Sequence, residues 1–288
     1  MTSTEPLRRE YLAGSLCLRG REMVWGARTY VMGIINVTPD SFSGDGIGND
    51  PEAAARRALE MEASGPAIID IGGESSRPGA PELDPLEELN RVVPCIEAVR
   101  AATPLPISVD TYHSAGAEAA LAAGADAVND IWGLRYDARM ADVVARSGAA
   151  LIAMHNQRGR GFHDVAGDIA AGFEATLALC DDAGIARERV ILDPGFGFGW
   201  RPEQNLEMVR RLPELWRFGL PLLVGTSRKS TLGLVLDAPV AERFEGTAAT
   251  VALSIAGGAD IVRVHEVAEM RRVAKVSDAV VRANWTAP

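Results

Sequence analysis

The chain has 288 residues, of which 47% are hydrophobic and 24% charged, and its formal net charge is −10. About 250 residues is a usual length for a closed α/β barrel, and the apolar share is enough to fill both a barrel interior and a layer between strands and helices. The acidic balance argues against a general nucleic-acid or membrane-surface binder. An anionic ligand would therefore have to be held by a local cluster of positive charge.

Cysteine usage and the N-terminal residues point to a cytoplasmic protein. The three cysteines are scattered, odd in number and free of metal-type spacing, which predicts reduced structural thiols. The first residues lack the apolar core of a targeting signal, and no stretch of the sequence reaches a membrane-spanning apolar length. We expect neither nucleic acid nor a membrane as a partner.

The chain begins with a predicted β-ribbon at about 15–31, with its turn at 20–22, which we expect to close the N-terminal end of a barrel. After it, short β-branched apolar runs alternate with helix-length segments. The apolar runs cover 29–36, 67–73, 106–110, 125–130, 149–155, 189–193, 221–225 and 259–265. The main predicted helices cover 51–64, 86–102, 114–123, 138–147, 168–184, 203–212, 245–258 and 266–283, with a further helix after 229.

Eight such alternations predict an α/β fold of the (β/α)₈ TIM-barrel type. The apolar runs are continuous rather than alternating, as expected for a parallel sheet that is covered on both faces. No break in composition or linker divides the chain. We therefore expect a single domain over 1–288, with the barrel at about 29–284.

Polar residues follow the predicted strands at their carboxyl ends, which lie on the same face of such a barrel and carry its chemistry. Asp110, Asn129 and Asp193 end three different strands and together offer acceptors and an amide to a flat ligand that is rich in donors. Structural N-caps would explain one such residue well, but three on separate strands poorly. Asn36 ends the first strand, where its amide oxygen is either a ligand for Mg²⁺ or part of a local Asx-turn.

Positive charge gathers after the last two strands, where barrels often bind phosphate. Lys229 is one of only two lysines in the chain, and it stands beside Arg228 in a predicted loop. The alternative for this cluster is ion pairing with acidic residues of neighbouring loops. After the second strand, Arg77 is either a bidentate anion ligand or an ordinary solvated side chain. His155 and His163 follow the fifth strand, where a structural role is one interpretation of either, and we assign them no function.

Three catalytic architectures are excluded, since the sequence has no P-loop pattern, no HExxH zinc helix and no GxSxG elbow. The run GFGFG is not a dinucleotide fingerprint, because it stands late in the chain and lacks the acidic residue that should follow.

Seven segments, in this order, closely resemble the dihydropteroate synthase family. They are MGIINVTPDSFSGDG (32–46), IIDIGGESSRPGA (68–80), ISVDTY (107–112), AVNDIWG (127–133), ILDPGFGFG (191–199), VGTSRK (224–229) and GTAATVALSIAGGADIVRVHEV (246–267). Together they cover nearly the whole chain. The resemblance implies a barrel enzyme of folate biosynthesis, usually a homodimer, that joins 4-aminobenzoate to 6-hydroxymethyl-7,8-dihydropterin diphosphate and releases pyrophosphate.

The resemblance also implies roles for residues of this chain. The pterin would be held by Asp110, Asn129, Asp193, Phe198 and Lys229. The diphosphate and its Mg²⁺ would be held by Asn36, Arg263 and His265, with Asn36 as the metal ligand. The 4-aminobenzoate site and its loops would involve Phe42, Ser76, Arg77, Pro78 and Ser227. The reaction itself would be carried by Asp110, Lys229, Arg263 and His265.

Two other functions remain open from the sequence. A related pterin-binding barrel transfers a methyl group from methyltetrahydrofolate to a corrinoid protein, but it has no need of ESSRPG, SRK and RVH together. A non-catalytic copy would keep the barrel and should have lost the charged residues of the mouth, which this chain retains.

Overall fold

The structure is a computed structural model that describes residues 9–38, 46–74 and 83–286. Its centre is a parallel sheet of eight strands with the order β8-β7-β6-β5-β4-β3-β10-β9. A parallel bridge between Leu192 and Leu222 joins the two ends of this order, so the sheet closes into a barrel. The strands are β3 (Tyr30–Asn36), β4 (Ile68–Gly72), β5 (Ile107–Asp110), β6 (Ala127–Asp130), β7 (Ala150–Met154), β8 (Val190–Asp193), β9 (Leu223–Val224) and β10 (Ile261–Val264).

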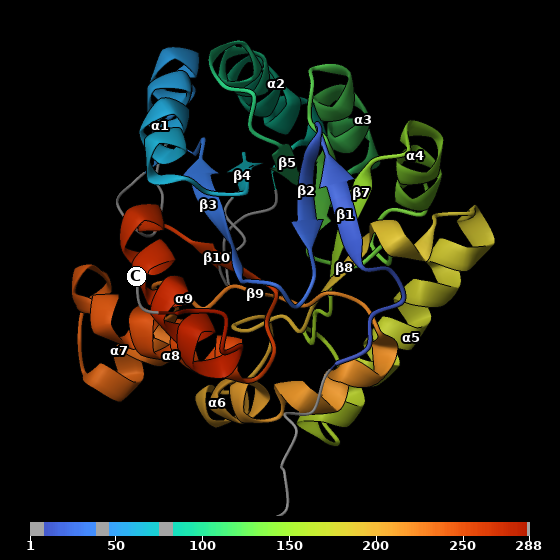
Figure 1. The fold of residues 1–288 in the computed structure, drawn as a ribbon. Coiled ribbons are helices and arrows are strands. Elements are labelled where there is room, and N and C mark those ends of the chain that lie inside the picture. Colours follow the sequence, from blue (N-terminus) through green and yellow to red (C-terminus); the bar gives the residue numbers. More distant parts are fainter. Residues whose placement is uncertain (1–8, 39–45, 75–82, 287–288) are drawn as a thin grey trace, which may run out of the picture.

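Helices surround the barrel, as Figure 1 shows in a view along its axis. This arrangement confirms the predicted α/β barrel. The α-helices are α1 (Pro51–Ser64), α2 (Pro85–Ala102), α3 (Ser114–Ala122), α4 (Met140–Ser147), α5 (Val165–Ala183), α6 (Pro202–Arg210), α7 (Ser230–Leu236), α8 (Phe244–Ala256) and α9 (Val267–Val281). None of the helices in the described ranges combines the length and the apolar character needed to cross a bilayer.

Helix boundaries follow local capping signals. The Asp50 carboxylate accepts hydrogen bonds from the backbone N–H groups of Glu52 and Ala53, and Pro51 occupies the first turn of α1. Gly65 ends the same helix in the left-handed region, with φ +74°, which a residue without Cβ adopts at little cost. Asp164 caps α5, so this helix begins at Val165 and not at 168 as predicted.

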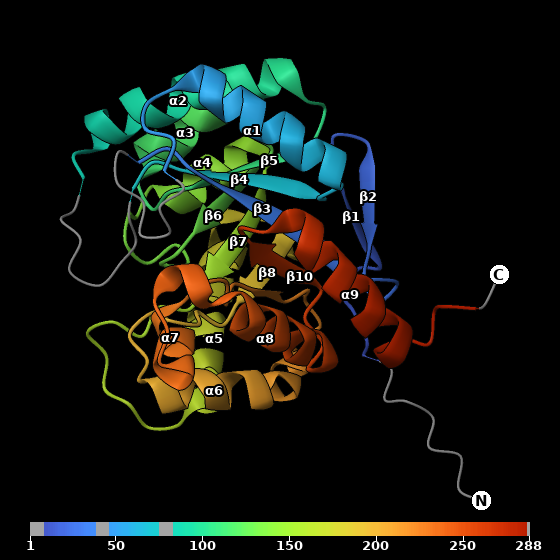
Figure 2. The same ribbon diagram turned by 90° about the vertical axis from the view of Figure 1, so that its left-hand side faces the viewer.

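The N-terminal ribbon consists of β1 (Ser15–Leu18) and β2 (Arg21–Val24), which pair antiparallel. The predicted turn at 20–22 was placed too late, because Arg21 already begins the second strand and Arg19 and Gly20 carry the positive φ values of the turn. Figure 2 shows the ribbon at one end of the barrel. Its apolar residues pack against the barrel interior in a cluster that includes Leu16, Met23, Trp25, Met32, Ile68, Ile152 and Ile261. The prediction that the ribbon closes the N-terminal end is confirmed.

Further elements differ from the sequence-based prediction. The seventh strand, expected over 221–225, is only Leu223–Val224. A 3₁₀-helix at Leu212–Phe218 follows α6 and was not expected.

Strand register places the polar strand ends at one rim. Asn36 is paired with Gly72, Gly72 with Asp110, and Asp110 with Asn129, so these four residues form one row across neighbouring strands. Asp70 and Ser108 are also paired and lie two residues earlier on their strands, which puts their side chains on the same face one layer deeper. The barrel interior is therefore apolar near the ribbon and polar near the opposite rim.

Candidate active site

The deepest polar group of this rim is the carboxylate of Asp70 on β4, which is fully buried. Its Oδ1 accepts a hydrogen bond from the Ser108 hydroxyl. Its Oδ2 accepts from Nδ2 of Asn129 at 3.1 Å and from Nε of Arg263 at 2.6 Å. One carboxylate thus links side chains of β4, β5, β6 and β10. Asp70 was not among the predicted site residues, although a single acidic residue inside an apolar strand is a signal that could have found it.

Arg263 connects this buried carboxylate to the mouth of the barrel. Its Nη2 donates to Oδ2 of Asp110 at 2.8 Å, while Nε is held by Asp70. Burial lowers the pKa of Arg263, but the two carboxylates outweigh it, so the net shift is upward. The guanidinium is therefore permanently charged and fixed in orientation.

Asp110 and Asp193 are carboxyls whose ionisation is opposed by burial. Burial, together with the Asp70 carboxylate, raises the pKa of Asp110 to about 7 against the opposing charges of Arg263 and Lys229. Burial likewise raises the pKa of Asp193 to about 6, although the backbone N–H of Gly195 donates to its Oδ1 at 2.8 Å. Near neutral pH these groups gain from a ligand that donates hydrogen bonds to the charged form.

Lys229 faces the same space from the N-terminus of α7. Burial and the charge of Arg263 lower the pKa of its ammonium to about 8, while Asp193 and Asp110 counteract this shift. The Nζ atom lies 4.2 Å from the ring centroid of Phe198, within cation–π range. Gly197 permits this approach: its φ is +86°, and a Cβ built there would stand 3.1 Å from Cδ of Lys229.

The predicted pterin residues are therefore brought together. Hydrogen bonds or charge interactions join Asp110, Asn129, Arg263 and Lys229. Asp193 faces Lys229, and the Phe198 ring lies beside the same ammonium.

A further member of the site that sequence reasoning missed is Arg158, whose guanidinium carbon lies 4.9 Å from the Phe198 centroid. Nothing in the sequence marks Arg158 apart from its position in the loop after β7.

Ser227 and His265 form a second contact at the rim, since the Ser227 hydroxyl and Nδ1 of His265 are 2.8 Å apart. Neighbouring Arg228 donates from Nε to Glu266 at 2.6 Å, so the ion-pairing alternative describes Arg228 correctly. Asn36 ends β3 in the same register row as Asp110. The predicted residues Phe42, Ser76, Arg77 and Pro78 lie outside the described residues.

His155 and His163, to which the sequence assigns no function, have local partners. His155 is buried, its Nε2 lies 2.8 Å from the side-chain oxygen of Gln157, and burial lowers its pKa to about 4. His163 is exposed and pairs with Asp168 at 3.2 Å. Neither contact connects these rings to the Asp70–Arg263 network.

Comparison with known proteins agrees with this geometry. Residues 32–265 match the model of a pterin-binding enzyme family. A curated dihydropteroate synthase of Clostridium beijerinckii is 46% identical over 263 residues, covering 91% of this chain and 98% of that protein.

Two solved structures of dihydropteroate synthases are also similar to this chain in fold and sequence. A dihydropteroate synthase of Clostridium difficile, crystallised in the presence of pteroic acid, has a TM-score of 0.85 and 47% identity, covering 90% of this chain and 98% of its own. The enzyme of Xanthomonas albilineans with 4-aminobenzoic acid has a TM-score of 0.86 and 38% identity, covering 93% and 98%. The chain accordingly belongs to the dihydropteroate synthases, within the pterin-binding enzyme family.

Proposed function

We propose that this chain condenses 6-hydroxymethyl-7,8-dihydropterin diphosphate with 4-aminobenzoate, at the rim formed by Asp110, Asn129, Asp193, Lys229 and Arg263. The observation that carries the proposal is the buried network in which Asp70 and Asp110 hold Arg263 beside Lys229. It places carboxylates, which match the N–H donors of an aminopyrimidinone edge, next to the cations that an anionic leaving group needs.

In the proposed reaction, the bond between the pterin methylene carbon and the diphosphate oxygen breaks, and its electron pair leaves with pyrophosphate. The electron-rich dihydropterin ring delocalises the positive charge that develops on the methylene. The amine nitrogen of 4-aminobenzoate then forms the new C–N bond and releases a proton.

Asp110 would stabilise the cation-like transition state, because a buried carboxylate acts on developing positive charge without solvent reorganisation. Arg263 and His265 would take up the charge of the departing diphosphate. Lys229, Asn129, Asp193 and Phe198 would orient the pterin, and Ser227 would border the 4-aminobenzoate site. Phe42, Ser76, Arg77 and Pro78 remain proposed contributors from the first two loops.

Mg²⁺ fits the donor set at Asn36. Mg²⁺ in such sites is held by one or two protein oxygens together with substrate phosphates and water. Asn36 supplies one neutral amide oxygen at the end of β3, and the carboxylates of Asp70 and Asp110 pair with Arg263. With the diphosphate bound, the ion would neutralise the charge of the leaving group.

The decisive test is pyrophosphate release by the whole protein with pterin diphosphate, Mg²⁺ and 4-aminobenzoate, together with chromatographic detection of 7,8-dihydropteroate. Lys229→Arg should lower turnover at least about 100-fold, because a planar guanidinium cannot replace a compact ammonium under Gly197. Lys275→Arg is the matched control, since Lys275 is the other lysine and is exposed. Methyl transfer from methyltetrahydrofolate without pyrophosphate release would establish the alternative barrel function.

The proposal includes a homodimer of single-domain chains. Exposed apolar side chains on the adjacent helices α7, α8 and α9 support it, since a large exposed apolar patch often marks an interface. They include Leu234, Val235, Leu253, Val276 and Val280. Sedimentation velocity should give twice the chain mass, and Val280→Glu should shift the protein towards the monomer.

A further inference from the structure

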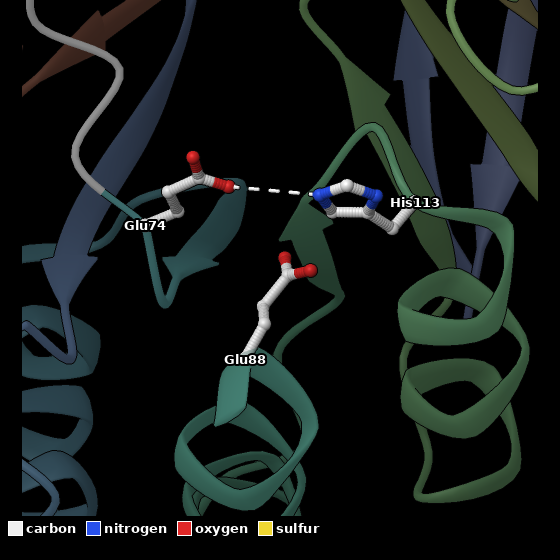
Figure 3. Close-up of side chains that lie close together, drawn as sticks. All are labelled: Glu74, Glu88 and His113. Atoms are coloured by element: carbon white, nitrogen blue, oxygen red, sulfur yellow. Dashed lines mark ion pairs between the residues drawn. The ribbon is translucent and has the colours of Figure 1, made fainter. Parts of the chain in front are cut away.

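Three ionisable side chains outside the Asp70–Arg263 network meet between the barrel and its helices. Figure 3 shows Glu74, which follows β4, Glu88 of α2, and His113, which precedes α3. One ligand atom from each lies within 4.8 Å of the other two. The pair Glu74 Oε2 and His113 Nε2 is separated by 3.9 Å.

Glu88 and His113 are buried, Glu74 is partly buried, and each of the three has a polar atom without a partner. Glu88 is 1% exposed and His113 is 8% exposed. Within the part of the chain that the structure describes, Oε2 of Glu74, Oε2 of Glu88 and Nε2 of His113 have no hydrogen-bond partner. A buried polar atom without a partner costs about 1–3 kcal/mol, and more when the group is charged. Three such atoms that face one another indicate a missing ligand rather than three separate defects.

Neighbouring groups hold two of the three side chains in place. The Tyr112 hydroxyl donates to Oε1 of Glu74 at 2.6 Å, which leaves Oε2 turned towards the cluster. The Tyr112 and His113 rings are in contact, with centroids 4.4 Å apart. The backbone N–H of His113 donates to the Thr111 hydroxyl at 3.2 Å. A hydrogen bond to a ligating side chain, such as the one from Tyr112 to Glu74, is typical of metal sites.

We propose that Glu74, Glu88 and His113 form a binding site for a divalent transition-metal ion of the Zn²⁺ type. Two carboxylate oxygens and one imidazole nitrogen are a ligand set that Zn²⁺ accepts, with a fourth position left for water. Two ionised carboxylates and a neutral imidazole carry a charge of −2, which such an ion balances. Ligand atoms of a tetrahedral zinc ion are about 3.3 Å apart, so the side chains close by roughly 1 Å around it.

This site is separate from the proposed Mg²⁺ position at Asn36 and does not depend on the proposed reaction. It does border the active site, because a small cavity is lined by both carboxylates of the cluster, by Asp110, Thr111 and Tyr112, and by Ile131. An ion held there would join β4, α2 and α3 directly behind Asp110. Its measurable effects are therefore metal affinity and thermal stability, whether or not the enzyme turns over.

The test is calorimetric titration of the whole protein, stripped with chelator and dialysed, with Zn²⁺ in the presence of excess Mg²⁺. We expect one ion per chain and a higher Tm with Zn²⁺. His113→Gln and Glu88→Gln should each weaken binding at least tenfold and abolish the rise in Tm. The matched controls are His163→Gln, which changes an exposed histidine, and Cys17→Ser, which removes the exposed thiol. Both should bind as the unaltered protein does.

A second measurement needs no variant and stands even if a substitution prevents folding. Anomalous scattering from crystals of the unaltered protein soaked in Zn²⁺ should place an ion between the three side chains. The proposal is overturned if calorimetry detects no binding, if the two cluster variants retain full affinity, or if the anomalous peak lies elsewhere.

Discussion

The two ends of the barrel interior use opposite kinds of packing. At the ribbon end, Met32, Ile68 and Ile152 form an apolar layer covered by Leu16 and Trp25. At the other end, strands of the same barrel carry Asp70, Ser108, Asp110, Asn129 and Arg263, which fill the interior with hydrogen bonds and charge. Stability and chemistry are thus divided along the barrel axis, so substitutions at one end should leave the function of the other intact.

The largest expected effect is on turnover at the polar end. Asp110→Asn should lower kcat by about 10²–10³-fold, because it removes the carboxylate that faces developing positive charge. Pterin binding, measured by calorimetry, should largely persist, since the amide keeps the shape of the side chain and can still accept a hydrogen bond. Turnover close to that of the unaltered protein would contradict the role of Asp110.

The apolar end should show the reverse behaviour. Trp25 is buried and contacts Tyr30 edge-on, with ring centroids 5.9 Å apart. Trp25→Ala should lower the free energy of unfolding by about 3–5 kcal/mol, measured by urea denaturation, and leave kcat and KM unchanged well below Tm. Trp285→Ala, at an exposed tryptophan, is the control and should change stability by less than about 0.5 kcal/mol. A loss of kcat in folded Trp25→Ala would show that the two ends are coupled.

A smaller effect is expected when pH changes the catalytic efficiency, kcat/KM. The Asp110 carboxyl, with its pKa raised to about 7 by burial, must be ionised, and the Lys229 ammonium, with its pKa lowered to about 8, must be protonated. Below pH 7 the carboxyl gains a proton, and above pH 8 the ammonium loses one. The profile of kcat/KM for the pterin diphosphate should therefore be bell-shaped, falling about tenfold per unit on each side. A flat profile between pH 5 and 9 would contradict the requirement for an ionised Asp110 and a protonated Lys229.

The smallest expected change concerns a single hydrogen bond at the rim. Ser227→Ala removes the 2.8 Å hydrogen bond to Nδ1 of His265, which is worth about 1 kcal/mol. Steady-state kinetics should show a KM for 4-aminobenzoate raised about fivefold and kcat within a factor of two. A kcat loss as large as that of Asp110→Asn would mean that the His265 ring takes a greater part in the reaction than its position suggests.

Much of the fold could be predicted because its signals are local. The first helix was predicted at 51–64 and lies at Pro51–Ser64, since Asp50, Pro51 and Gly65 mark its ends. The length of β9 was overestimated, because apolar residues beside a strand are buried whether or not they form the backbone hydrogen bonds of the sheet. The 3₁₀-helix after α6 has no distinct periodic pattern.

The site was predictable where a polar residue ends a strand, as Asp110, Asn129 and Asp193 do. Asp70 was missed because it lies inside a strand, where sequence alone does not say which layer its side chain enters. Glu88 was missed because its surroundings on α2 resemble those of an exposed acidic residue. Its burial depends on Gly116 of α3, where a Cβ would stand 3.2 Å from Oε2 of Glu88.

The Asp70 carboxylate has a consequence for how this chain can vary. Ser108, Asn129 and Arg263 all donate to it, so its two oxygens are shared by three other strands. Replacing any one partner leaves the others with an uncompensated buried charge or donor, whereas replacing all of them together restores balance. The four positions 70, 108, 129 and 263 should therefore be substituted together or not at all in natural variants, although they span nearly two hundred residues of sequence.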